Sequence, residues 1–189
     1  MTTTAWGPLA PLIGTWESDD DGIDISFHSD QGKLGETRYR ERTTYDAVGP
    51  VQLGTRTLYG LDYRTQAWRV GEDQPFHTEI GYWMWDHEQQ LVVRCFLVPH
   101  ATSLIAGGHV TPDASTLTLS SSLGSPTYGI LSSQFFTAVA QTTRFDVTVT
   151  LRGDSYSYEQ TTQVEYQEQP TVILHTDRNT LRRVHSTTA

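Results

Sequence analysis

Two side chains with acid–base chemistry occur two residues apart near the middle of the sequence. His77 and Glu79 lie in a segment that alternates like a β-strand, so both side chains leave the same face. A carboxylate beside an imidazole orients the ring and raises its basicity, and such a pair can act as a general base. The same spacing also fits a polar pair on the outer surface. The sequence leaves both interpretations open.

The other polar clusters do not have the spacing of a metal site. Asp19-Asp20-Asp21 is a run of acids, but it lacks the alternating oxygen ligands and the closing glutamate of an EF-hand loop. We therefore expect residues 17–21 to form an exposed turn. None of the seven histidines is part of a His-x-x-x-His motif. Cys95 is the single cysteine, which excludes an intrachain disulfide and a Cys-x-x-Cys motif.

Charge and composition exclude several classes of partner. The chain has 13 basic and 22 acidic residues, and its formal net charge of −9 repels nucleic acid and anionic membrane surfaces. No segment has the roughly 20 consecutive apolar residues that a membrane span requires. The N-terminus has neither the basic start nor the apolar run of a signal peptide. We therefore expect a soluble, cytoplasmic protein.

Alternation of apolar and polar residues runs through most of the chain. In residues 144–151, Phe145, Val147 and Val149 alternate with polar side chains, which indicates a half-buried strand. The segment 152–155 supplies turn residues, and a second alternating run follows it. This pattern predicts a β-hairpin.

The number of such runs predicts the fold class. About eight to ten strands joined by short turns indicate an all-β domain over residues 1–189, a closed antiparallel up-and-down β-barrel. Residues 1–13 are long enough for a short helical turn. Residues 128–140 are ambiguous, because their apolar positions fit a short helix and a bent strand equally well. We expect the large aromatic side chains of Trp16 and Trp83 to be buried.

Four motifs, in order along the chain, resemble those of nitrobindin-type β-barrels. They are Leu12-Ile13-Gly14-Thr15-Trp16, Tyr39-Arg40-Glu41 running on to Tyr45, Val48, Gly49 and Pro50, Phe76-His77-Thr78-Glu79-Ile80-Gly81-Tyr82-Trp83, and His175-Thr176-Asp177 leading to Leu181-Arg182-Arg183. The third motif is the most specific, because it is similar to the family's His-x-Glu-x-Gly-Tyr-Trp strand.

The resemblance implies a barrel of about ten strands, related in shape to fatty-acid-binding proteins and other lipocalin-like (calycin) barrels. It also implies a bound haem, taken here as haem b, held by a histidine of the last strand with a second histidine on the distal side. On this sequence His175 is then the candidate proximal ligand of the haem iron and His77 the distal candidate. Phe76 and Leu97 are similar to pocket-lining positions. The family binds nitric oxide and is assigned the isomerisation of peroxynitrite to nitrate, so enzymatic activity here is conditional on haem.

Two segments depart from the family pattern. After Trp16 the family continues with glycines, whereas residues 17–22 form an acidic loop here. In the last strand, the family's ligand position falls nearer Thr176 than His175, and a shift of one residue on a strand reverses the face. Either a bulge near residues 177–179 turns His175 inward, or the ring points outward and does not ligate haem. The alternative role for His175 is a core or rim histidine with a local hydrogen bond, for example to Asp177.

The alternative function is a metal-free carrier of a fatty acid or another apolar small molecule. Fatty-acid-binding proteins clamp the ligand carboxylate with an Arg-x-Tyr pair, which this sequence lacks. Arg94 is a mid-strand arginine among apolar residues that needs a partner, and it is a candidate for that role. An enzyme that uses His77 and Glu79 as its base is a third hypothesis. The sequence leaves open whether the chain forms a homodimer.

Overall fold

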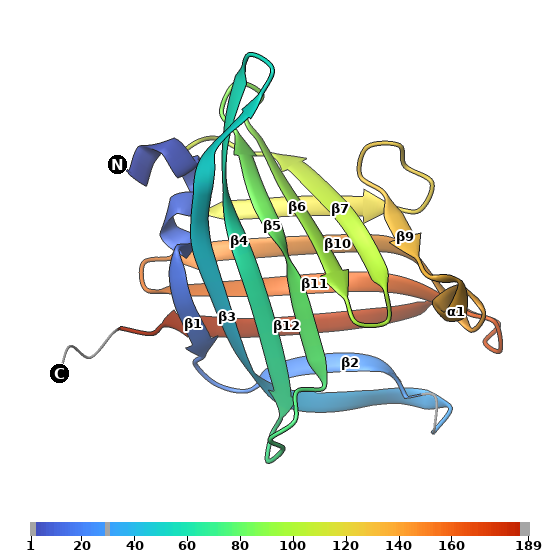
Figure 1. Ribbon diagram of the computed structural model, residues 1–189. Coiled ribbons are helices and arrows are strands. Elements are labelled where there is room, and N and C mark those ends of the chain that lie inside the picture. Colours follow the sequence, from blue (N-terminus) through green and yellow to red (C-terminus); the bar gives the residue numbers. More distant parts are fainter. Residues whose placement is uncertain (1–2, 29–30, 186–189) are drawn as a thin grey trace.

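Antiparallel strands wrap around a central axis in the computed structural model, which describes residues 3–28 and 31–185 (Figure 1). In chain order the elements are η1 (Thr3–Leu12), β1 (Gly14–Ser18), β2 (Gly22–His28), β3 (Lys33–Leu53), β4 (Arg56–Arg69), β5 (His77–Asp86), β6 (Leu91–Val98), β7 (Thr102–His109), β8 (Thr116–Ser122), β9 (Ile130–Ser132), α1 (Gln134–Thr137), β10 (Ala140–Arg152), β11 (Ser155–Tyr166) and β12 (Ile173–Arg183).

The sheet closes on itself through its first and last strands. Its order is β1-β12-β11-β10-β8-β7-β6-β5-β4-β3-β2, and β12 also pairs with β2 while β1 also pairs with β3. β1 and β2 thus share one position in the wall, separated by the acidic turn, and β9 only extends the edge of β7. The wall has ten strand positions, which confirms the predicted closed barrel.

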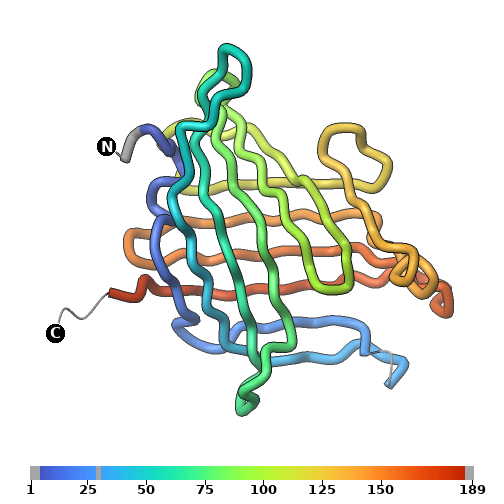
Figure 2. The backbone as a smooth tube through the Cα atoms, viewed as in Figure 1, coloured from blue at the N-terminus to red at the C-terminus, as the bar shows by residue number. Residues whose placement is uncertain are grey.

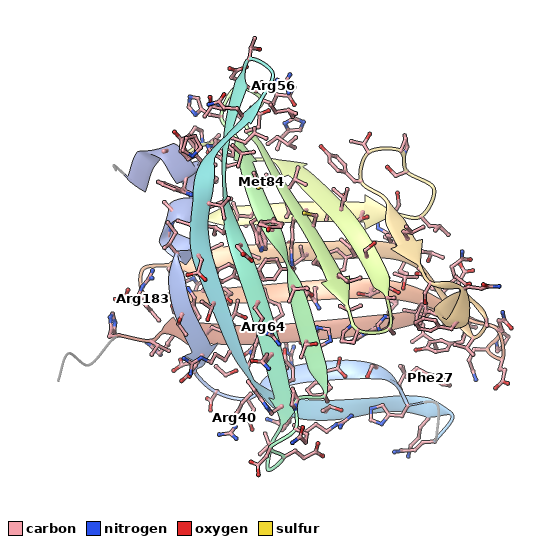
Figure 3. All side chains as sticks on the ribbon, in the orientation of Figure 1. Phe27, Arg40, Arg56, Arg64, Met84 and Arg183 are labelled. Atoms are coloured by element: carbon pink, nitrogen blue, oxygen red, sulfur yellow. The ribbon has the colours of Figure 1, made fainter. Side chains whose placement is uncertain are left out.

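The alternation in the sequence separates the interior from the surface. Along β3, Tyr39, Glu41 and Thr43 are buried, whereas the intervening arginines are exposed. Figure 3 shows Arg40 and Arg64 on the outer surface of the barrel. Period-two patterning therefore places a mixed aromatic and polar face inside, because every second residue of a closed barrel points inward.

The N-terminal segment η1 closes one end of the barrel (the dark blue segment in Figure 2). Trp6, Leu9 and Leu12 are buried there, and the indole Nε1–H of Trp6 donates to the Gly60 carbonyl at 2.9 Å. Gly7 has a φ of 50°, and a Cβ at this position would meet the Trp85 ring at 2.5 Å. A glycine is required here both for the backbone conformation and for the close approach.

The sequence also predicted the burial of single residues and the structure of short segments. Trp16 and Trp83 are 1% and 2% exposed, which confirms their predicted burial. Of residues 17–21, all are exposed except Ser18, which is half-buried. The ambiguous segment 128–140 contains both predicted structures, since the short strand β9 is followed by the single-turn helix α1. No helix among the described residues is long and apolar enough to cross a membrane.

The closing segment η1 is expected to be part of the folding core. Leu9→Ala removes a fully buried side chain and should lower the free energy of unfolding by about 2–4 kcal/mol. The matched control is Leu131→Ala, at a side chain 73% exposed, which should change it by less than about 0.5 kcal/mol. Urea unfolding followed by tryptophan fluorescence measures both. Equal effects of the two changes would show that η1 does not pack on the barrel.

Candidate functional site

A cavity opens at the end of the barrel opposite η1. Along β5, His77 lines this cavity at the start of the strand, while Trp85 packs against η1 near its end. The cavity has a volume of about 100 Å³, and its mouth is open to solvent.

His175 lies on the inner face of β12 and lines this cavity. β11 and β12 pair without a register shift from Ile173 to Arg182, so the bulge that was one of the two alternatives is absent. His175 nevertheless faces inward, because it has the same parity along the strand as the buried Leu181. Its Nε2 atom hydrogen-bonds to a carboxylate oxygen of Asp24 on β2. The other alternative, an outward-pointing ring, is therefore wrong.

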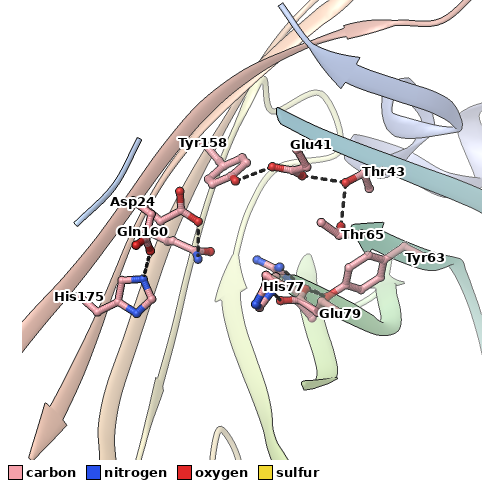
Figure 4. A network of polar contacts seen from close by, with 12 residues as sticks. Asp24, Glu41, Thr43, Tyr63, Thr65, His77, Glu79, Tyr158, Gln160 and His175 are labelled. Carbon is pink, nitrogen blue, oxygen red and sulfur yellow. Dashed lines mark hydrogen bonds and ion pairs between the residues drawn. The ribbon is translucent and has the colours of Figure 1, made fainter. Parts of the chain in front are cut away.

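His77 and Glu79 also face the interior, so the interpretation as an outward polar pair is wrong. The His77 Nε2 atom lies 3.9 Å from the nearest Glu79 carboxylate oxygen. Glu79 is buried and accepts hydrogen bonds from the Tyr63 hydroxyl and the Arg94 guanidinium. Figure 4 shows the His77 ring beside Glu79 on one wall and the His175 ring on the facing wall. The barrel thus brings together two imidazoles that are far apart in the sequence.

Each imidazole has a carboxylate partner whose charge is maintained. Burial tends to raise the pKa of Glu79, but the Arg94 charge and His77 outweigh it and lower this pKa to about 2. Burial tends to lower the pKa of His77, but its contact with Glu79 outweighs burial and raises it. Burial likewise opposes ionisation of Asp24, yet the hydrogen bond to His175 keeps the pKa of that carboxyl below its usual value.

Two further carboxyl groups line the same cavity. Glu41 accepts hydrogen bonds from Tyr158 at 2.6 Å, Thr43 at 2.8 Å and Asn179 at 3.2 Å. Asp177 accepts from the Tyr39 hydroxyl and from Gln160. Within the described residues neither carboxyl contacts a lysine or an arginine. Burial therefore raises the pKa of both groups, that of Asp177 to about 7.

The two apolar site candidates fall in different places. Phe76 lines the cavity, where its ring packs against Tyr39 with centroids 5.9 Å apart. Leu97 does not line this cavity and instead borders a separate recess. The Arg94 side chain points inward from β6, so Leu97, an odd number of residues along the strand, lies on the outer face and is 44% exposed.

The sequence interpretation missed the polar groups that surround the histidines. Asp24, Glu41, Tyr158 and Asp177 line the same cavity as His77 and His175. For Glu41 a signal existed, because it alternates with the exposed arginines of β3 and must face inward. For Asp24 no local signal existed, because its partner is 151 residues away in the sequence.

Comparison with known proteins agrees with this architecture. The family model described as "THAP4-like, heme-binding beta-barrel domain" matches residues 5–183. The chain belongs to this family. The crystal structure of Rv2717c from M. tuberculosis has the same fold, with a TM-score of 0.66 over 96% of this chain and 98% of that chain. The identity of 20% supports the fold alone. No curated protein sequence matches the chain.

Membership of this haem-binding family raises the question of whether the cavity residues fit a haem. The side chains of His175 and His77 are 36% and 40% exposed, so both rings can be reached from the mouth. Nε2 of His175 is engaged by Asp24, and the described residues provide no hydrogen bond to Nδ1, which leaves that atom for a metal. The cavity volume of about 100 Å³ is smaller than a porphyrin, so the two histidines at the mouth, and not the enclosed volume, are the groups that would hold it. The residues fit the group.

The buried ion pair predicts strong coupling between its two members. Arg94→Met leaves Glu79 charged and unpaired and should lower the free energy of unfolding by about 3–5 kcal/mol. Adding Glu79→Gln should restore part of the loss, with a coupling energy of about 1–3 kcal/mol. Urea unfolding of the two single variants and the double variant measures this. Additive effects would show that the pair does not act as a unit.

The raised pKa of Asp177 predicts a pH-dependent stability. Between the ordinary pKa of 3.8 and about 7 the unfolded chain loses this proton while the folded protein keeps it, so stability falls as the pH rises. Asp177→Asn removes this titration. Between pH 5 and pH 8, the free energy of unfolding of wild type should therefore fall by about 1–3 kcal/mol relative to that of Asp177→Asn. Asp20→Asn, on the exposed turn, is the control. Equal pH profiles for wild type and Asp177→Asn would contradict the prediction.

Proposed function

We propose that the protein binds haem b, that His175 would ligate its iron and that His77 would line the space for a second ligand. The proposed activity is the binding of nitric oxide, and with it the isomerisation of peroxynitrite to nitrate. The observation that carries this proposal is the presence of two partly exposed imidazoles on facing walls of one cavity. The family to which the chain belongs is described as haem-binding, which supports the same choice.

The two histidines have different environments, and this difference supports their different roles. His175 is hydrogen-bonded to the carboxylate of Asp24 and lies on a strand without a register shift. A rigidly held imidazole of this kind suits a ligand of haem iron. His77 is held less tightly, at 3.9 Å from Glu79, and the Glu79 carboxylate raises the pKa of the ring, which favours its protonated form relative to an ordinary histidine. A protonated imidazole donates a hydrogen bond to an anionic or polar ligand in the cavity.

When bound, the haem would supply the coordination position for nitric oxide and the iron chemistry of the isomerisation, which involves no net oxidation or reduction. The protein residues supply orientation and polarity. Glu79 is fixed by Arg94 and Tyr63, so the carboxylate beside His77 cannot turn away from the ring. Phe76 provides a flat apolar surface near the mouth.

A metal-free carrier of fatty acids has less support in this cavity. Arg94, the proposed anchor for a ligand carboxylate, already pairs with Glu79 and lies against the rings of Trp83 and Phe96. The interior also presents four carboxyl groups, those of Asp24, Glu41, Glu79 and Asp177. An anionic head group would be repelled by those that are ionised.

The proposal predicts unequal effects of removing the two histidines. His175→Ala should weaken hemin binding at least tenfold, because it removes the direct bond to iron. His77→Ala removes only a hydrogen bond worth about 1 kcal/mol and should weaken binding about fivefold or less. Titration of the haem-free protein with hemin, followed at the Soret band, measures both.

His185→Ala is the matched control, since this side chain is 71% exposed and lies outside the cavity. Adding nitric oxide to the same samples tests the second half of the proposal, which expects a shift of the Soret band. Wild-type-like hemin binding by His175→Ala, or weak binding that is the same in all four proteins, would overturn the assignment.

A further inference from the structure

Asp24, which hydrogen-bonds to His175, lies on the short strand β2, where the sheet closes onto β12. β2 pairs with β12 over three residues, and Asp24 lies directly opposite Asp177 in this register. The Asp24 side chain therefore points into the barrel next to His175, which lies two residues before Asp177 on β12. Figure 4 shows the Asp24 carboxylate and the His175 ring joined by a hydrogen bond at the left wall.

Asp24 is itself fixed on its second oxygen. The Ser26 hydroxyl donates to Asp24 Oδ1 at 2.6 Å, while Oδ2 bonds to Nε2 of His175. Asp24 is 7% exposed, so water does not compete freely for either bond. Ser26, Asp24 and His175 thus form a chain of contacts in which each member limits the rotation of the next.

We propose that Asp24 is the positioning residue of the iron ligand, and that it holds the His175 ring with the proton on Nε2 and the lone pair of Nδ1 directed at the metal. This inference rests on the proposed function. A carboxylate that accepts the N–H of a ligating imidazole fixes its tautomer and makes the ring a stronger electron donor. A stronger donor stabilises ferric over ferrous iron, so Asp24 should lower the reduction potential of a bound haem.

The hydrogen bond between Asp24 and His175 could also have the opposite effect on haem binding, and experiment distinguishes the two. If Asp24 holds His175 away from iron, removing its charge would free Nε2 and strengthen binding. If Asp24 positions the ring, the change must weaken binding instead. The two readings therefore predict effects of opposite sign for Asp24→Asn.

The test compares wild type with Asp24→Asn, Ser26→Ala and the control Asp20→Asn, whose carboxylate is exposed on the turn before β2. In the haem-free proteins, ¹⁵N NMR of the His175 ring reports the tautomer. Wild type should show protonated Nε2 and bare Nδ1, and Asp24→Asn should show a mixture of tautomers. This measurement also establishes that each variant is folded.

In the hemin-loaded proteins, Asp24→Asn should bind hemin about 10–100-fold more weakly than wild type. Its ferric/ferrous midpoint potential should become more positive, and the iron–histidine stretching frequency of the ferrous protein should fall. Ser26→Ala should shift the same quantities in the same direction by less, because it loosens Asp24 without removing its charge. Asp20→Asn should match wild type.

The outcomes separate this inference from the function on which it rests. If wild type binds hemin in a His175-dependent way but Asp24→Asn has unchanged affinity and potential, or binds more tightly, the positioning role is overturned and the proposed function stands. If wild type does not bind hemin specifically, the proposed function fails and this inference fails with it. A wild-type apo protein with the proton on Nδ1 of His175 would also overturn the inference.

Discussion

Arg94 carries a full charge into the interior of the barrel, where it contacts Glu79, Tyr63 and the rings of Trp83 and Phe96. An unpaired guanidinium in this position would be strongly destabilising, so the Glu79 carboxylate must stay close to it. This requirement fixes Glu79, and Glu79 in turn sets the position and raises the pKa of His77. The environment on one wall of the cavity follows from that single ion pair.

The other carboxyl groups of the cavity have no lysine or arginine partner among the described residues. Glu41 and Asp177 accept hydrogen bonds from tyrosine, threonine and amide donors, and burial raises the pKa of both carboxyl groups. Asp24 differs, because His175 and Ser26 stabilise its charged form. The cavity therefore contains acids of similar type in different protonation states, and the hydrogen-bond partners decide which is which.

The sequence predicted the fold well because a closed barrel repeats one rule. Inward and outward residues alternate, so the strands, the burial of Trp16 and the shared face of His77 and Glu79 could be predicted locally. The family resemblance placed Leu97 at the pocket, whereas its parity relative to Arg94 puts it on the outer face. Asp24 could not be found from the sequence, because its contact with His175 exists only once β2 has joined β12. The orientation of His175 depended on whether its strand contains a bulge, which local pattern does not determine.

Among the described residues, Trp6, Leu9 and Leu12 of η1 fill one end of the barrel, and the cavity opens at the other end. A molecule in the cavity then enters and leaves past the same side chains at this mouth. A second molecule cannot push the first one through, so exchange of occupants is strictly sequential. The release rate of the first occupant then limits how quickly the site turns over, and that rate depends on the few side chains around the mouth.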